Sequence, residues 1–314
     1  MIENLFIFAV SIFLIIKGAT LSTKYSFRIA DNFKISKYVV GFIMVAIISI
    51  VPEIFVSLNA AIAGVPSLAL GTLFGSNIAD LTLVFAIVIF FAGRSIKIES
   101  KILKENIIYP FFLLIPIVLG FDGFYSRWEG LGLIIAGLIF YYLALRNNTK
   151  DEEEAEESIL ELKTNKKKDV YFLIASMAAL LVGSHFVVVS AVDIAASLKV
   201  SSAVIGMLAI GVGTTMPELF FCLSAVKRNH DSLAIGDVLG TVLADATIVV
   251  GFLALIDPFA FPQKIIYIAG IFMVASSFLL FFFMRTGKTL SKNESYLLFF
   301  FWLLFVVVEI TLNS

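Results

Sequence analysis

The sequence predicts an all-α polytopic membrane protein with about ten transmembrane helices, arranged as two inverted five-helix repeats. Three observations predict this fold class. The 314-residue chain is 60% hydrophobic and only 15% charged, with a mean hydropathy of +1.01, whereas soluble domains are about 45–50% apolar and about 25% charged. Apolar runs of roughly 20 residues recur along the whole chain. The two halves of the chain also resemble each other.

The apolar runs define the expected spans. The first run is preceded by no basic residue, since Glu3 is the only early charge, so we interpret it as a span and not as a cleaved signal peptide. The expected spans are, in order, 4–22, 38–63, 66–91, 106–120, 128–146, 170–196, 201–227, 232–256, 264–284 and 294–312.

One long hydrophilic segment, 147–169, divides the spans into two groups of five. Its acidic block is followed by a basic block, which is typical of a solvated linker. We therefore expect a first five-helix repeat at 1–147, with its central motif at 41–91. A cytoplasmic linker follows at 148–169, and the second repeat at 170–314 has its central motif at 206–256.

The basic residues predict the orientation. They gather in the first, third, fifth, seventh and ninth loops, whereas the other loops hold only Arg127, Lys199 and Lys264. By the positive-inside rule the odd loops, including 147–169, are cytoplasmic and both termini lie outside. We expect a multi-pass protein of the plasma membrane. With five spans per half, the two halves enter the membrane in opposite senses.

The two halves superimpose without a gap at one constant offset, which places Gly18 over Gly183 and Pro52 over Pro217. "KISKYVVGFIMVAIISIVPEIFVSLNAA" lies over "KVSSAVIGMLAIGVGTTMPELFFCLSAV", and "LALGTLFGSNIADLTLV" lies over "LAIGDVLGTVLADATIV". A single offset held this far indicates internal duplication. Duplication with opposite orientation is the inverted repeat of secondary transporters.

Four carboxylates fall in register near the middle of spans: Glu53 and Asp80 in the first half, Glu218 and Asp245 in the second. Charged residues inside spans are costly and usually functional. The inverted repeat would bring the four together, where like charges cannot all stay ionised without cations. Oxygen ligands without thiolate or imidazole suit calcium, sodium or protons.

The prolines beside the two glutamates explain a second feature. Pro52 and Pro217 are expected to break their helices and to free carbonyl oxygens near 46–49 and 211–214. Side-chain hydroxyls stand nearby, two of them four residues before the aspartates and therefore on the same helical face. The predicted cation ligands are Glu53, Glu218, Asp80, Asp245, Ser49, Thr214, Thr215, Ser76 and Thr241.

Other polar residues receive plainer interpretations. We expect Asp237 to be a mouth residue or local cap near the cytoplasmic end of its span, and His185 to have a helix-packing role. Cys222, the single cysteine, is expected to be a small apolar helix residue; it excludes an internal disulfide and a cysteine-based metal cluster. Glycines spaced by four are expected to permit close helix packing; they are Gly71, Gly75, Gly236 and Gly240.

At these residues the sequence resembles the calcium/cation antiporter superfamily, which includes sodium/calcium exchangers. That family carries two repeats with "G-T-S-x-P-E" followed by "G-S-N-x-x-D" or "G-S-x-x-x-N"; this chain has "ISIVPE…FGSNIAD" and "GTTMPE…LGTVLAD". The resemblance covers essentially the whole chain. It implies alternating access, with Ca²⁺ held by Glu53 and Glu218 and by the backbone carbonyls of Ser49 and Thr214. The first and sixth spans would slide across the core.

The same resemblance implies a transporter and not an enzyme, without a cofactor. Its partners would be inorganic cations and the lipid bilayer, with no nucleic acid. Two departures bear on the coupling ion. Ile48 and Ile50 stand where the family usually has glycine and a hydroxyl residue, and Asp80 stands where sodium/calcium exchangers often have asparagine. Sodium is the expected counter-ion, and exchange of Ca²⁺ or another divalent cation for protons is the alternative.

Two other classes of protein place acids inside a membrane. An intramembrane aspartyl protease needs "G-x-G-D", but the nearest string here is "AIGD", and four symmetric acids have no use in such an enzyme. A cation channel or a binding-only sensor could share the same site. A channel would carry downhill flux that is independent of a counter-ion, and a sensor would bind its cation without flux.

Overall fold

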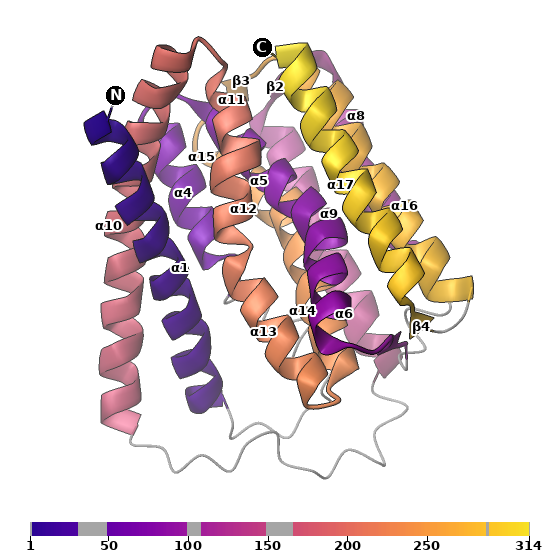
Figure 1. The fold of residues 1–314 in the computed structure, drawn as a ribbon. Coiled ribbons are helices and arrows are strands. Elements are labelled where there is room, and N and C mark those ends of the chain that lie inside the picture. Colours follow the sequence, from indigo (N-terminus) through magenta and orange to yellow (C-terminus); the bar gives the residue numbers. More distant parts are fainter. Residues whose placement is uncertain (1, 31–48, 99–107, 149–165, 287–288, 314) are drawn as a thin grey trace.

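A computed structural model describes residues 2–30, 49–98, 108–148, 166–286 and 289–313 of the chain. Helices make up nearly all of this part (Figure 1). Eight of its helices are long and apolar enough to cross a membrane, and two shorter apolar helices cover Val51–Ile62 and Tyr109–Asp122. The structure therefore confirms an all-α, multi-pass membrane protein, with about ten helices as expected.

The first half contains long helices interrupted at a few positions. Helices α5 and α6 are joined by a π-helical segment, η2, into one apolar rod that matches the expected span 66–91. The elements are α1 (Ile2–Ala30), α4 (Val51–Ile62), α5 (Pro66–Ala79), η2 (Asp80–Val84), α6 (Phe85–Ala92), β1 (Ile96–Lys97), α8 (Tyr109–Leu119), the 3₁₀ segment η3 (Gly120–Asp122), β2 (Phe124–Tyr125) and α9 (Arg127–Asn148).

The second half repeats this order. It starts with α10, which begins at Lys166, four residues before the expected start of the second repeat. The elements are α10 (Lys166–Leu198), α11 (Ser202–Ile205), the π segment η5 (Gly206–Ile210), α12 (Gly211–Thr214), α13 (Met216–Lys227), α14 (Asp231–Ala244), the π segment η6 (Asp245–Val249), α15 (Val250–Ile256), β3 (Phe259–Ala260), the π segment η7 (Ile266–Gly270), α16 (Ile271–Thr286), β4 (Thr289–Leu290) and α17 (Lys292–Asn313).

The observed helices follow the expected spans closely, but several expected segments extend beyond the described part of the chain, among them the start of the expected span 106–120. Most of the first half of the expected span 38–63 and most of the linker 148–169 lie outside the described residues. The first residue of α1 and the last residues of α17 lie at the same end of the molecule (Figure 1), as an even number of crossings requires.

The duplication is visible in single hydrogen bonds. Helix α9 starts with a capping box in which Glu129 Oε2 accepts from the Ser126 amide and hydroxyl, each at 2.8 Å. Helix α17 starts in the same way, with Glu294 Oε2 accepting from the Ser291 amide and hydroxyl at 2.7 Å. A capping box satisfies backbone donors that the first helical turn leaves free. The two boxes occupy equivalent positions at the offset that relates the halves, so the repeat fixes helix starts as well as spans.

Two small antiparallel sheets tie the repeats together. Strand β1 pairs with β4, and β2 pairs with β3, so each sheet takes one strand from each half. Strands β2 and β3 lie at the end of the molecule that carries the termini, and β4 lies at the opposite end (Figure 1). Each repeat is thereby anchored to the other at both ends of the helical body.

Helices α1 and α10 lie side by side at the edge of the molecule (Figure 1). Behind them, α5 packs directly against the α11–η5–α12 segment, and glycines make the approach possible. A Cβ atom at Gly71 would lie 3.0 Å from Ala203 Cα, and one at Gly211 would lie 2.8 Å from the Ser76 amide nitrogen. The expected packing role is confirmed for Gly71 and Gly75, which both face backbone atoms of the other half.

Candidate functional site

Each proline–glutamate pair starts a new helix. Helix α4 begins at Val51 and α13 at Met216, so Pro52 and Pro217 occupy the second position of the first turn, where a missing N–H costs no hydrogen bond. The preceding residues, Ile50 and Thr215, have nearly the same backbone angles, φ −69° and ψ −6° against φ −76° and ψ −5°. The helix of the second repeat is therefore interrupted at Thr215, as predicted, whereas the expected carbonyls at 46–48 of the first repeat lie outside the described residues.

The break gives each glutamate an electrostatic advantage. Glu53 and Glu218 lie in the first turn of their helices, where the partial positive charge of a helix N-terminus favours a carboxylate. A glutamate in the middle of an unbroken helix would lack this interaction. The proline and the glutamate thus act together, because one creates the helix end that the other uses.

A π-helical segment begins at each of the two aspartates. Asp80 opens η2, and its equivalent in the second repeat, Asp245, opens η6. Within these segments Thr82 and Thr247 occupy equivalent positions and donate to the carbonyl oxygens of Ile78 and Leu243. Single π-helical turns widen a helix locally and are frequent at functional sites. The chain therefore changes its helical geometry just where its membrane acids occur.

The structure buries every predicted ligand. None of the nine is more than 2% exposed, although they come from α4, α5, α12, α13, α14, the breaks between them and the starts of two π segments. They are Ser49, Glu53, Ser76, Asp80, Thr214, Thr215, Glu218, Thr241 and Asp245.

Several of the hydroxyl groups present their oxygen atoms in a way that suits a cation. The Ser76, Thr214 and Thr215 hydroxyls each donate to the carbonyl oxygen three residues earlier, at 2.9–3.0 Å. A hydroxyl that has given its proton to a carbonyl keeps its lone pairs available. The Thr241 hydroxyl is buried without any hydrogen-bond partner in the described part of the chain.

The carboxylates of the two repeats meet. Glu218 interacts electrostatically with Glu53 and Asp80, and Asp245 interacts with the same two residues. Thr214 of the second repeat also hydrogen-bonds Glu53 of the first. The structure therefore places acids of the two repeats within electrostatic reach of one another.

These acids lack partners within the described residues. Both carboxylate oxygens of Glu218 and of Asp245 are buried without a hydrogen bond, as are Glu53 Oε2 and Asp80 Oδ1. No three of the described Cys, His, Asp and Glu side chains converge closely enough to hold one metal ion. A cation bound by one or two of these acids would therefore draw on hydroxyl oxygens as well.

The structure contradicts the sequence-based interpretation of Asp237. It is not a mouth residue, because its side chain is fully buried and accepts a hydrogen bond from the Ser49 hydroxyl at 3.2 Å. Its charge also acts on Asp80 and Glu218. The sequence did hold a signal, since Asp237 stands four and eight residues before Thr241 and Asp245, on the same helical face.

Two other interpretations also need correction. His185 is exposed on the outer surface of α10, where its ring contacts the neighbouring Phe186, so it does not pack between helices of the described part. Cys222 is buried in α13, as expected, but its thiol lies 3.5 Å from the Ala234 carbonyl and 3.9 Å from Asp237 Oδ2. It is therefore a neighbour of the acidic cluster and not simply an apolar helix residue.

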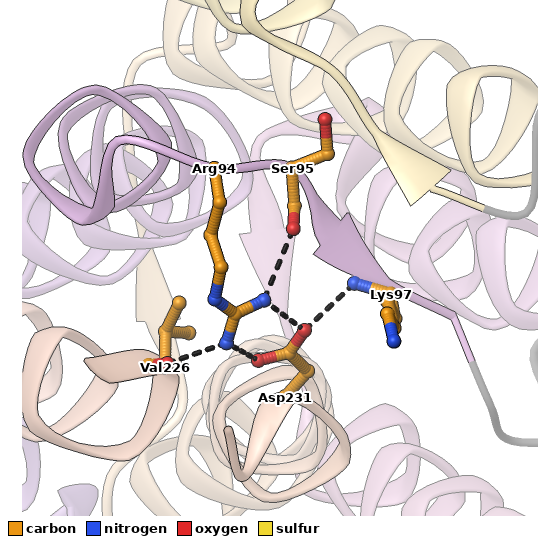
Figure 2. A network of polar contacts seen from close by, with 5 residues as sticks. All are labelled: Arg94, Ser95, Lys97, Val226 and Asp231. Carbon is orange, nitrogen blue, oxygen red and sulfur yellow. Dashed lines mark hydrogen bonds and ion pairs between the residues drawn. The ribbon is translucent and has the colours of Figure 1, made fainter. Parts of the chain in front are cut away.

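An ion pair braces the helices that carry the second half of the site. Arg94, just after α6, forms two hydrogen bonds to the Asp231 carboxylate at 2.6 and 2.7 Å (Figure 2). The same carboxylate accepts from the Lys97 amide at 2.8 Å, and the guanidinium also donates to the Val226 carbonyl. The end of α13 and the start of α14 are thereby fixed to the end of α6.

The family can now be identified. A model of the family described as sodium/calcium exchanger protein matches residues 3–146 and again residues 168–311. The chain belongs to the sodium/calcium exchanger family. The two matched ranges correspond to the two repeats, and membership makes this exchanger a membrane transporter of cations and not an enzyme.

Individual relatives agree with this placement. The exchanger is 24% identical to the sodium/calcium exchanger MaX1 of Methanosarcina acetivorans, over 97% of this chain and 98% of that protein. It is 30% identical to an uncharacterized membrane protein of Methanocaldococcus jannaschii, over 76% of this chain and 77% of the relative. Its fold matches the sodium-calcium exchanger NCX_Mj with a TM-score of 0.69 and 25% identity, over 98% of each chain.

Proposed function

We propose that this exchanger is a secondary active antiporter that exchanges Ca²⁺ for Na⁺ across the plasma membrane by alternating access, without a cofactor. The ion site is formed by the nine buried residues named above, with Glu53 and Glu218 as the calcium carboxylates. Asp80 and Asp245, with the hydroxyls of Ser76 and Thr241, border the positions taken by the counter-ions.

One observation carries this proposal: the carboxylates of Glu218 and Asp245 are buried without partners in the described part of the chain, between two inverted repeats. Burying an unpaired carboxylate costs several kcal/mol, so these groups need positive charge. Calcium takes about 6–8 oxygen ligands, and the carboxylates and hydroxyls of the nine residues offer that many. The Gly211 and Val212 carbonyls, expected to be free, accept hydrogen bonds from Thr214 and Thr215. Sodium accepts the same kind of ligand, so one site can alternate between the two ions.

The exchange mechanism follows from the cost of leaving the site empty. Repulsion among unpaired acids opposes the conformational change, whereas a loaded site is neutralised and can cross. Helices α1 and α10 form a pair at the edge of the molecule (Figure 1), which suits them to slide across the rest of the helical body. Only loaded forms then exchange sides, and uptake of one ion is coupled to release of the other.

A second candidate is exchange of Ca²⁺ for protons. Ile50 removes a hydroxyl from the first repeat and Asp80 adds a carboxylate. A carboxylate can carry a proton across the membrane, whereas a lost hydroxyl weakens a sodium site.

The deciding experiment is ⁴⁵Ca²⁺ uptake into proteoliposomes loaded with sodium, with potassium, or with acid inside. We expect uptake driven by an outward sodium gradient. Uptake that responds only to the proton gradient would show that protons, and not sodium, are the counter-ion. Calcium flux that needs no counter-ion would identify a channel, and binding without flux would identify a sensor.

Glu53→Gln and Glu218→Gln test the site itself. Each removes one negative charge while keeping the size of the side chain, and we expect each to abolish exchange while the protein still folds. Size-exclusion chromatography and the thermal unfolding midpoint serve as the folding controls. Calcium exchange retained by both variants would rule out the proposed site.

We further propose that residues 1–147 and 170–314 form the two repeats, that the linker 148–169 is cytoplasmic and that both termini lie outside. The clustering of basic residues in the odd loops supports this orientation, and so does the location of both termini at one end of the molecule (Figure 1). In a Cys222→Ser background, single cysteines at Asn4 and Asn148 should react with an impermeant maleimide from opposite sides. Labelling of both from the same side would contradict the orientation.

A further inference from the structure

Asp237 is the acidic residue of the site that has no equivalent in the other repeat. Its position in the first half is occupied by Thr72, and the position equivalent to its neighbour Cys222 is occupied by Ser57. Both equivalents are buried and uncharged. Every other carboxylate of the site has an acidic counterpart at the equivalent position of the other repeat, so Asp237 makes the site asymmetric.

The asymmetry extends to the hydroxyls beside the two helix breaks. Thr214 hydrogen-bonds Glu53 across the repeats. Its equivalent, Ser49, instead donates to Asp237 Oδ1 at 3.2 Å, and Glu218 is left with two buried oxygens that have no partner in the described part of the chain. Asp237 therefore takes the hydroxyl proton of Ser49, whereas the equivalent Thr214 gives its hydroxyl proton to the Gly211 carbonyl.

We propose that Asp237 is a positioning residue that orients the Ser49 hydroxyl toward the bound cation and raises the calcium selectivity of the site. This inference rests on the proposed function. A serine hydroxyl has one proton and two lone pairs. When Asp237 accepts the proton, both lone pairs of the Ser49 oxygen stay available to a cation.

The negative charge of Asp237 also favours Ca²⁺ over Na⁺. It lies close enough to Asp80 and Glu218 to interact with both electrostatically, and its energy with a divalent ion is twice that with a monovalent ion at the same distance. Loss of the charge should therefore weaken Ca²⁺ more than Na⁺. An outer group that orients a metal ligand typically contributes about 10- to 100-fold in affinity.

The test is a double-mutant cycle with Asp237→Asn, Ser49→Ala and the double variant in the full-length protein. Calcium binding is measured in detergent by titration calorimetry, and the KM for Ca²⁺, the KM for Na⁺ and kcat are measured in proteoliposomes. We expect Asp237→Asn to raise the calcium KM and Kd about 10- to 100-fold, with a smaller change for Na⁺ and in kcat. Ser49→Ala should add little once Asp237 is changed.

Thr72→Ser is the matched control, because it changes the equivalent buried position of the other repeat without altering charge. If Asp237→Asn does not fold, Asp237→Thr, which copies the first repeat, takes its place in the cycle. Additive effects of the two substitutions, or equal losses for Ca²⁺ and Na⁺, would overturn the inference while the proposed function stands. Failure of the wild-type protein to exchange calcium would instead reject the proposed function.

Discussion

The contact between Thr214 and Glu53 joins single residues of the two repeats, as the hydrogen bond from Ser49 to Asp237 does. A threonine side chain is branched at Cβ, which restricts its rotamer, and the Thr214 hydroxyl is held further by its bond to the Gly211 carbonyl. The surroundings of Glu53 in the first repeat thus depend on a fixed side chain of the second.

Thr214→Val tests this dependence. Valine has the shape of threonine but lacks the hydroxyl, so the variant should lose the buried hydrogen bond to the Gly211 carbonyl, about 0.5–1.5 kcal/mol of unfolding free energy. Loss of the contact with Glu53 should raise the calcium KM. Urea unfolding and ⁴⁵Ca²⁺ uptake measure the two effects. Ser57→Ala is the control, because the Ser57 hydroxyl is buried without a partner in the described residues and its loss should leave the KM unchanged. A normal KM in Thr214→Val would show that Glu53 needs no such restraint.

Sequence reasoning singled out nine polar residues that the structure buries, but it misjudged Asp237. The nine were noticeable because a duplicated, in-register set of polar residues in apolar spans is a strong pattern. Asp237 breaks that pattern, since its counterpart is Thr72, and it was assigned by its distance from the loop at Lys227. Its spacing from Thr241 predicts its position better than its distance from the loop does. Residues four apart lie on the same face of a helix, so Asp237 is expected on the side of α14 that carries Thr241.

At the scale of elements, the helices are held together by backbone contact. A Cβ atom at Gly75 would lie 2.5 Å from Met207 Cα, closer than real Cβ contacts allow. Gly75 lies one residue before Ser76, so the close approach of α5 to η5 also sets the distance between the two repeats at the ion site.

Gly75→Ala should therefore separate α5 from η5. We expect a loss of about 1–3 kcal/mol of unfolding free energy, typical of overpacking, and a marked drop in exchange. Thermal unfolding in detergent and calcium uptake measure both. Gly132→Ala is the matched control, since a Cβ atom there meets nothing within 4 Å and alanine favours the helix by up to about 1 kcal/mol. Equal stability of the two variants would contradict the proposed contact.

The Arg94–Asp231 ion pair is a second link between elements (Figure 2). Arg94→Ala leaves the buried Asp231 carboxylate with the Lys97 amide but without its charge partner. Because Arg94 is about a third exposed, we expect a loss below the roughly 3–5 kcal/mol seen for fully buried pairs. The thermal midpoint should fall by several degrees, whereas Arg228→Ala, at an exposed arginine, should not change it. Unchanged stability in Arg94→Ala would show that the brace is dispensable.

The span boundaries were predictable at this scale, but the interruptions of the helices were only partly so. Pro52 and Pro217 predicted that new helices start at α4 and α13. The π segments at Asp80 and Asp245 had no such signal, because a widened turn leaves the apolar pattern of a fully buried helix unchanged. The pairs β1–β4 and β2–β3 are two residues long, too short for an alternating pattern to appear.

If α1 and α10 slide as a pair across the rest of the molecule, contacts within the pair are kept and contacts between the pair and the other helices change. Gly18 of α1 lies against Leu180 of α10, inside the pair proposed to slide. Ile12 of α1 lies against Gly213 of α12, between that pair and the rest of the helical body; a Cβ atom at Gly213 would lie 2.9 Å from the Ile12 side chain.

Engineered disulfides in a Cys222→Ser background test the motion. Ile12→Cys with Gly213→Cys should stop exchange when oxidised and restore it after reduction, because the bond ties α1 to the body. Gly18→Cys with Leu180→Cys should permit exchange in both states, because the two helices move together. Calcium uptake before and after reduction gives the comparison. Full exchange by the oxidised first pair would show that α1 does not slide there.

The fold class and the inverted repeat were predictable because both depend on long-range regularities of the sequence, namely apolar runs and one constant offset between the halves. Contacts at helix ends, such as the one between Arg94 and Asp231, follow no sequence period and became visible only in the structure. The fold and its symmetry are therefore predictable because the same sequence pattern occurs in both halves. A contact present in one half alone leaves no such repeated pattern.

The paired capping boxes and the paired π segments carry a consequence for the history of the molecule. A widened helical turn at Asp80 and at Asp245, and the same Ser–Glu start of α9 and α17, are too detailed to have arisen independently in both halves. The two halves therefore derive from one duplicated five-helix unit. Asp237 and the Arg94–Asp231 pair have no counterparts, because Thr72, Phe259 and Pro66 stand at the equivalent positions, so they mark where the two copies have diverged.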